Sequence, residues 1–157
     1  MRLADAQAIA DATLRHGREI DAAPLTVAVL DAGGHVVVLE REDGSGIVRP
    51  QIAVAKAYGA VGMGMSSRAL ATRAETQPVF FGSLAAVTDG RLAPAPGGVL
   101  VRDEEGVLLG AVGVSGDVSD VDETCAVHGV AAADLVPEPG LATLSDASSD
   151  TGDASES

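Results

Sequence analysis

Two pairs of apolar runs, each joined by a turn, constrain the fold of this chain more than any other feature. Residues 25–30 and 36–41 flank the segment 31–35, which contains two adjacent glycines. Glycine supplies the positive φ angles that tight hairpin turns need. Residues 97–102 and 107–114 form a second pair across a short acidic turn. We therefore predict two antiparallel hairpins, and the unbroken apolar run in 36–41 favours a strand covered on both faces.

The remaining segments favour helices. An apolar stripe with a period of about 3.6 residues predicts a first helix near residues 3–20, and a segment rich in alanine and glycine predicts a second, tightly packed helix near 51–65. Further expected elements are a short helix through residue 74, a loop at 78–82, a helical turn at 84–87, an edge strand at 92–93 and a last helix at 120–135.

These elements predict a single α+β domain with a mostly antiparallel sheet flanked by helices. The domain is expected to span residues 1–136. Residues 137–157 form an acidic segment rich in Ser and Asp, with little apolar bulk. Such a segment buries too little apolar surface to offset its ordering entropy, so we expect a disordered tail.

Charge and cysteine content limit the function classes. The net charge is −13, with 23 acidic against 10 basic residues. Binding to nucleic acid or to an anionic membrane surface needs a basic face, so neither partner is expected. The sequence shows no apolar signal core and no run of about 18 apolar residues. Because there is a single cysteine, Cys125, no intrachain disulfide forms, and we expect a cytoplasmic protein.

The junction between the last strand and the last helix is rich in small and acidic residues. Gly113, Ser115 and Gly116 end the strand, and Ser119 stands three residues before Asp122. Small residues allow a ligand or another backbone to approach closely. The spacing predicts that Ser119 caps the helix. A helix start with no further role is the alternative interpretation.

Lys56 is the only lysine, and it lies in an alanine-rich helix. A buried ammonium needs a partner, so Lys56 either forms an internal ion pair with Asp31, Asp122 or Glu123, or anchors an anion, or acts as a base. Arg41 at the end of a strand suits a bidentate carboxylate or a salt bridge at the sheet edge.

The motifs at residues 29–35, 39–44, 52–57 and 96–99, with the segment 113–116 and the Asp122-Glu123 pair, stand in an order that resembles the GlcG/HbpS-like family. The resemblance covers the ordered part of the chain. It implies a five-stranded antiparallel sheet with flanking helices, layered as in profilin and PAS domains, and homo-oligomers, in some cases large. It also implies binding of haem in some relatives and shows no reaction common to all.

If haem binds, its axial ligand is expected among the histidines. His16 lies on the apolar stripe of the first helix, and His128 shares a helix face with Cys125, which we expect to be a small buried side chain. His35 lies on a turn and is expected to be solvated. The Asp31 side chain before the two glycines is expected to stabilise that turn.

Three functional hypotheses remain. The first is a homo-oligomeric binding protein for haem or a related anionic tetrapyrrole. The second is an enzyme acting on a small carboxylate metabolite, and the third is an assembly module without a ligand. The expected cofactor-binding residues are Lys56, Arg41, Asp31, Gly113, Ser115 and Gly116; the expected catalytic residues of an enzyme are Lys56, Asp122 and Glu123; the expected iron ligands are His16 and His128.

Overall fold

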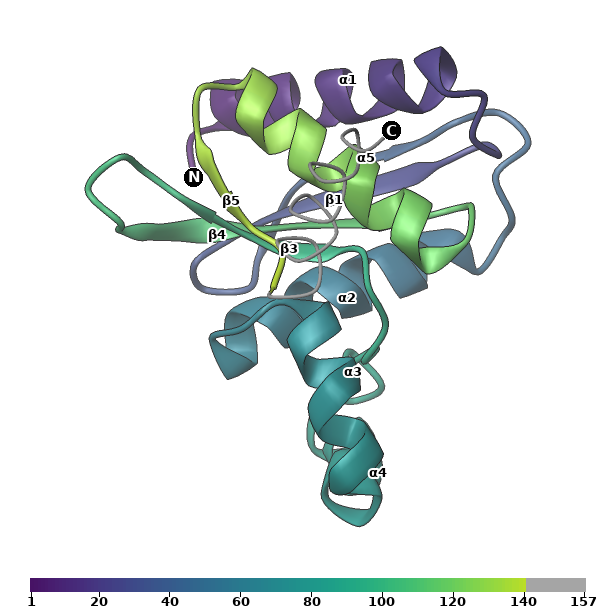
Figure 1. Cartoon of the computed structure of the whole chain (residues 1–157), viewed down its shortest axis with the longest axis vertical. Coiled ribbons are helices and arrows are strands. Elements are labelled where there is room, and N and C mark those ends of the chain that lie inside the picture. Colours follow the sequence, from purple (N-terminus) through teal and green to yellow (C-terminus); the bar gives the residue numbers. More distant parts are fainter. Residues whose placement is uncertain (141–157) are drawn as a thin grey trace, which may run out of the picture.

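A computed structural model describes residues 1–140. Within that range five helices surround one sheet of five strands (Figure 1). The strand order is β2-β1-β4-β3-β5, and every neighbouring pair is antiparallel, so the predicted fold class is confirmed. The elements are α1 (Leu3–Glu19), β1 (Thr26–Asp31), β2 (Val36–Arg41), α2 (Arg49–Met63), α3 (Ser67–Thr76), α4 (Pro78–Val87), β3 (Gly98–Arg102), β4 (Leu108–Ser115), α5 (Ser119–Ala132) and β5 (Val136–Glu138).

Helices cover both faces of the sheet. Alternate residues of a strand point to opposite faces, so Val27 and Val29 of β1 join one core cluster while Ala28 and Leu30 join another. The first cluster lies beneath α1 and α5, and the second lies beneath α2 (Figure 1). The three-layer arrangement places the carboxyl end of β4 beside α2 and the start of α5.

Glycines set how closely the layers approach. A Cβ atom on Gly113 of β4 would lie 1.9 Å from the carbonyl oxygen of Ala53, so only glycine lets α2 pack directly on the sheet there. A Cβ on Gly129 of α5 would lie 1.9 Å from Oγ1 of Thr13 in α1. The small residues predicted to pack α2 closely therefore pack it against the sheet of its own chain.

The segment 78–87 differs from the prediction. A loop and a helical turn were expected, and the structure has a continuous helix, α4. Pro78 occupies the first turn of the helix, where its missing N–H has no intrahelical partner to lose, so it starts the helix instead of breaking it. The α3–α4 arm extends away from the body of the domain (Figure 1).

The sheet edges also differ from the prediction. β2 is an edge strand with Val36 and Leu39 about half exposed, so the expected cover on both faces is wrong. Residues 92–93 form no strand, and the other edge is β5, which pairs with β3. The domain boundary expected at residue 136 falls inside β5, so the structured part continues at least through that strand. Residues 141–157 of the expected tail lie outside the described residues.

Candidate functional site

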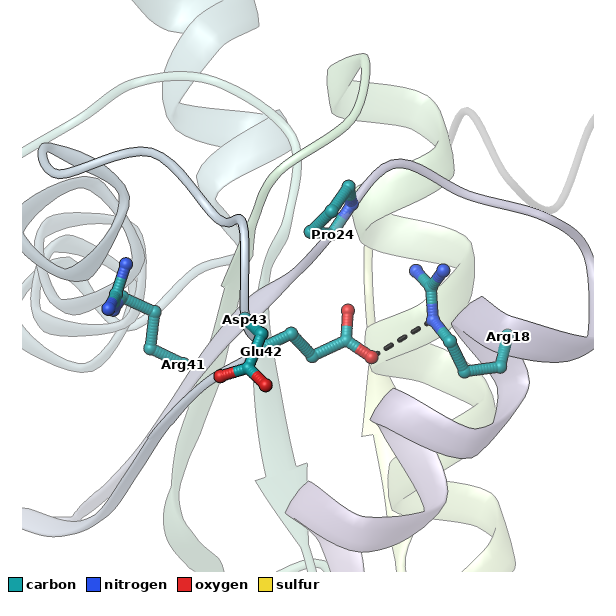
Figure 2. A pocket seen from close by; sticks show the side chains of 5 residues that line it. All are labelled: Arg18, Pro24, Arg41, Glu42 and Asp43. Carbon is teal, nitrogen blue, oxygen red and sulfur yellow. Dashed lines mark ion pairs between the residues drawn. The ribbon is translucent and has the colours of Figure 1, made fainter.

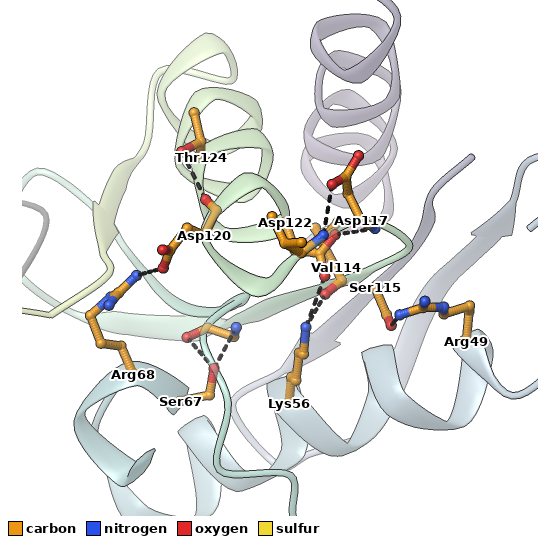
Figure 3. Close-up of polar contacts among 12 residues, drawn as sticks. Arg49, Lys56, Ser67, Arg68, Val114, Ser115, Asp117, Asp120, Asp122 and Thr124 are labelled. Atoms are coloured by element: carbon orange, nitrogen blue, oxygen red, sulfur yellow. Dashed lines mark hydrogen bonds and ion pairs between the residues drawn. The ribbon is translucent and has the colours of Figure 1, made fainter. Parts of the chain in front are cut away.

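Lys56 lies beside the strand-to-helix junction, as expected from the sequence. Its Nζ donates to the Val114 carbonyl oxygen at 2.9 Å and to Oδ2 of Asp122 at 3.1 Å (Figure 3). Both side chains are almost inaccessible, 3% and 1% exposed. Burial is the main reason that the pKa of Lys56 lies below its usual value and that of Asp122 above it. Of the alternatives for Lys56, the geometry is that of an internal ion pair, which leaves neither a base nor an anion anchor open to solvent.

The start of α5 is organised by Asp122 and not by Ser119. The residue preceding the helix is Val118, which makes no side-chain cap, so the predicted capping role of Ser119 is wrong. Oδ1 of Asp122 instead accepts the backbone N–H of Asp117 at 2.9 Å. Asp122 thus binds the bend on one side and Lys56 on the other, which ties α2 to α5.

A second ion-pair group lies next to the first. The Nε of Arg68 donates to both carboxylate oxygens of Glu123, at 3.0 and 3.1 Å. The Nη2 of Arg68 donates to Asp120 (Figure 3). Glu123 is fully buried, and burial raises its pKa against the opposing effect of Arg68. Ser66 caps α3 through the Ala69 N–H and so fixes the helix that carries Arg68. This group connects α3 to α5 and supports the structure.

The small residues of the junction accommodate the chain itself. A Cβ on Gly113 would meet α2, and a Cβ on Gly116 would lie 2.3 Å from the Pro24 carbonyl oxygen. The buried Ser115 hydroxyl accepts a hydrogen bond from Arg49 at 3.2 Å (Figure 3). The small residues were expected to admit either a ligand or another backbone. In the structure another backbone approaches closely at both glycines.

An open pocket lies at the end of β2. Its volume is about 440 Å³, and its lining residues are Arg18, Pro24, Arg41, Glu42 and Asp43 (Figure 2). Arg18 pairs with Glu42 at 2.9 Å. The Arg41 guanidinium donates to the Ser45 carbonyl oxygen at 2.7 Å and has no carboxylate partner among the described residues. Two arginines and two carboxylates thus line the pocket, and the Arg41 guanidinium points away from Glu42 and Arg18 (Figure 2).

A second, more apolar pocket of about 310 Å³ lies between β2, α2 and the turn after α4. Leu39 and Val54 contribute apolar side chains, and Arg91 contributes a cation that also lies over the Tyr58 ring, 4.2 Å from its centroid. Lys56 lines neither pocket. Lys56 and Arg41 therefore do not line one pocket, although both were expected beside the same ligand.

The other predicted residues lie elsewhere. Asp31 accepts the backbone N–H groups of Gly33 and His35 at 2.9 Å each, which confirms its role in the turn, and His35 is exposed. Cys125 is buried, and burial raises the pKa of its thiol to about 11, so it is the small packed side chain that was predicted. His16 and His128 stack on one another and line neither pocket, so their role as iron ligands stays a prediction.

Arg18 and Arg68 were not predicted from the sequence. Arg18 lies in the last turn of α1 and donates to the carbonyl oxygens of Ala22 and Ala23, a position where basic residues commonly satisfy free carbonyls. That local signal could have singled out Arg18. The partners of Arg68 are more than 50 residues away, and no local pattern indicates them.

The fold and the two pockets define a single-domain α+β protein with helices on both faces of an antiparallel sheet. The family model described as "haem degrading protein HbpS-like" matches residues 1–131. The chain therefore belongs to the HbpS-like family. A comparison with curated proteins gave no match.

Solved structures agree with this assignment. The crystal structure of a PduOC–haem complex has a TM-score of 0.79 at 23% identity, covering 88% of this chain and 98% of the other. The Klebsiella pneumoniae protein ORFY has a TM-score of 0.77 at 26% identity, covering 85% and 90%. A variant of Streptomyces reticuli HbpS has a TM-score of 0.73 at 28% identity, covering 83% and 85%. Among the described residues no helix is both long and apolar enough to cross a bilayer.

Proposed function

We propose that this protein binds haem or a related anionic tetrapyrrole, with the carboxylate edge of the ligand held in the pocket beside Arg41. Membership of a family described as haem degrading supports the class of ligand. The observation that carries the position is Arg41, which lines a pocket of about 440 Å³ and whose guanidinium has no carboxylate partner among the described residues. A planar guanidinium binds a carboxylate through two parallel hydrogen bonds.

The residues of this pocket fit one part of haem. Arg18 and Arg41 suit the two propionates, although Arg18 already pairs with Glu42. None of the five lining residues is a His, Cys, Met or Tyr, the side chains that hold haem iron. The proposal therefore assigns propionate binding to this pocket and assigns it no axial ligand.

The test is a haem titration followed by absorbance of the Soret band. The wild-type protein is expected to give a saturable shift near one haem per chain. Arg41→Gln is expected to weaken binding about tenfold, because a hydrogen bond to a charged group contributes about 1.5–3 kcal/mol. Arg41 is exposed, so the substitution leaves the core intact.

Arg2→Gln is the matched control. Arg2 precedes the same helix that carries Arg18 near its end, about 24 Å away along the axis. It is exposed, and its one ion-pair partner among residues 1–140 is Asp5. Equal haem affinity for wild type and Arg41→Gln would refute the assigned position. A spectrum of free haem with every variant would refute haem binding itself.

The proposal does not extend to an enzyme that uses Lys56. A base or an anion clamp needs access to the substrate, and the Lys56 ammonium is 3% exposed and already bound to Asp122 and Val114.

The proposal places the protein in the cytoplasm, which its single thiol suits because one cysteine needs no oxidising compartment.

The proposal includes a homo-oligomer that assembles through α4. Val79, Phe80 and Val87 of this helix are exposed, between 49% and 87%, on the arm that projects from the domain (Figure 1). Contiguous exposed apolar side chains commonly mark an interface. Size-exclusion chromatography with light scattering is expected to show an oligomer that Val79→Glu dissociates. A monomeric wild type, or an unaffected variant, would refute assembly through α4.

A further inference from the structure

Two histidines that lie more than 100 residues apart in sequence meet where α1 and α5 pack together. The rings of His16 and His128 are stacked, with centroids 3.9 Å apart and planes 9° from parallel. Glu19, one helical turn after His16, places Oε2 at 3.3 Å from the His16 Nδ1. One candidate ligand atom from each of the three side chains lies within 4.8 Å of the others.

The backbone holds this group in place. Gly129 follows His128, and Thr13 precedes His16 by three residues. These two residues make the close contact between the helices, since a Cβ on Gly129 would overlap the Thr13 hydroxyl. The Thr13 hydroxyl itself donates to the Ile9 carbonyl oxygen and is buried. Side chains that project from rigid, tightly packed helices keep their spacing without a ligand, which is the requirement for a preorganised site.

We propose that His16, Glu19 and His128 bind a divalent late transition-metal ion, of which Zn²⁺, Ni²⁺ and Cu²⁺ are the candidates. Two imidazoles and one carboxylate are a common ligand set for these ions, and water fills the remaining positions. Hard ions such as Mg²⁺ prefer oxygen ligands, so they are not expected to compete. The proposed site shares no residue with the Arg41 pocket, so it stands or falls independently of propionate binding there.

The site is open to an ion from solvent. The His16 side chain is 18% exposed and Glu19 is 58% exposed, while His128 is also exposed. The net charge of −13 raises the local concentration of cations around the chain. No Lys or Arg forms an ion pair with Glu19 among the described residues, so its carboxylate remains available.

Metal binding requires only side-chain movement. Donor atoms at about 2.1 Å from a tetrahedral ion lie about 3.4 Å from one another. The candidate ligand atoms of His16, Glu19 and His128 now lie up to 4.8 Å apart, so they must move closer together. The stacked rings must tilt so that one nitrogen of each turns toward the ion. Glu19 and His128 are exposed and have room to make that adjustment, whereas the helix contact at Gly129 stays unchanged.

The test uses untagged, full-length protein and Zn²⁺, titrated by competition with a chromogenic chelator at about pH 7.5, since protons compete with metals for imidazole. The wild type is expected to bind one Zn²⁺ per chain, and excess Mg²⁺ is expected not to displace it. His16→Gln, Glu19→Gln and His128→Phe are each expected to weaken binding at least about tenfold. His35→Gln is the control, because His35 pairs with Asp31 on a separate hairpin turn.

His128→Phe separates a metal site from simple ring packing. Phenylalanine preserves the stacked ring but removes the nitrogen, so this variant is expected to keep the melting temperature of the metal-free protein and to lose the rise that Zn²⁺ causes in wild type. Wild type that binds no Zn²⁺ overturns the proposal. Zn²⁺ binding that survives His16→Gln and His128→Phe unchanged also overturns it, because the ion then lies elsewhere.

Discussion

The buried pair of Lys56 and Asp122 gives the sharpest prediction for stability. Lys56→Met removes the ammonium and leaves the Asp122 carboxylate 1% exposed, with the Asp117 N–H still bound but no cation. Breaking a buried ion pair by removing one partner costs about 3–5 kcal/mol, because the remaining charge is uncompensated. We therefore expect Lys56→Met to lower the free energy of unfolding by about 4 kcal/mol.

The double variant Lys56→Met/Asp122→Asn tests the cause. Asparagine keeps an oxygen for the Asp117 N–H and removes the second charge, so stability is expected to return to within about 1–2 kcal/mol of wild type. The two substitutions would then be strongly non-additive, with a coupling energy of about 2 kcal/mol or more. Arg102→Met is the control, because the Arg102–Glu138 pair is part-exposed and such pairs contribute about 0–1 kcal/mol.

Urea unfolding monitored by circular dichroism measures these differences. A Lys56→Met variant that unfolds within about 1 kcal/mol of wild type would refute the expected penalty, since a buried charge would then have lost its partner at no cost. A double variant as unstable as the sum of the single variants would refute it as well. That result would mean that the two side chains act separately.

Three further predictions concern packing, acid stability and thiol reactivity. Gly113→Ala is expected to destabilise the fold by about 1–3 kcal/mol in thermal unfolding, because its Cβ would overlap the Ala53 carbonyl. The control Gly62→Ala, with no atom within 4 Å of its Cβ, is expected to stabilise α2 by about 0.5–1 kcal/mol. Equal effects of the two substitutions would contradict this packing argument. The backbone N–H groups of Ala23 and Val118 lower the pKa of Asp117 below 3.8, so its stabilisation is present above that pH and is lost as pH falls through the folded-state value. The free energy of unfolding of Asp117→Asn should therefore fall less than that of wild type as the pH is lowered through the acid range. An equal fall in both proteins would contradict the stabilising role of Asp117. The buried Cys125, with a pKa of about 11, should react with a thiol reagent only in denaturant, and rapid labelling of the native protein would contradict its burial.

Local patterns predicted the main elements. The glycine turn at Gly33–Gly34 and the flanking apolar runs placed the first hairpin, and the helical period placed α1, because both signals lie within a few residues. The helix at Pro78 was missed because proline both ends and begins helices, and the outcome depends on how the residues after it pack. β5 was missed because it has only three residues and is a strand only through its pairing with β3, more than 30 positions earlier, which no local pattern indicates.

The candidate site was predicted less completely. A lone lysine among alanines indicated a buried cation, but its partner had to be chosen among Asp31, Asp122 and Glu123, and tertiary structure alone selects Asp122. Arg41 was identified, yet its pocket also depends on Arg18, which α1 brings to the same place. Neither contact has a local sequence pattern, because the partners meet only after the helices dock on the sheet.

The two edges of the sheet differ in their capacity to recruit another chain. β5 has three residues and includes Pro137, which has no N–H to donate, so this rim is poorly suited to further pairing. β2 is six residues long, has no proline and pairs only with β1 among residues 1–140, and its Val36 and Leu39 are partly exposed. At high protein concentration, or after partial unfolding, another chain would therefore add its strand to the β2 edge and start aggregation there. A charged residue introduced in β2 would oppose this pairing.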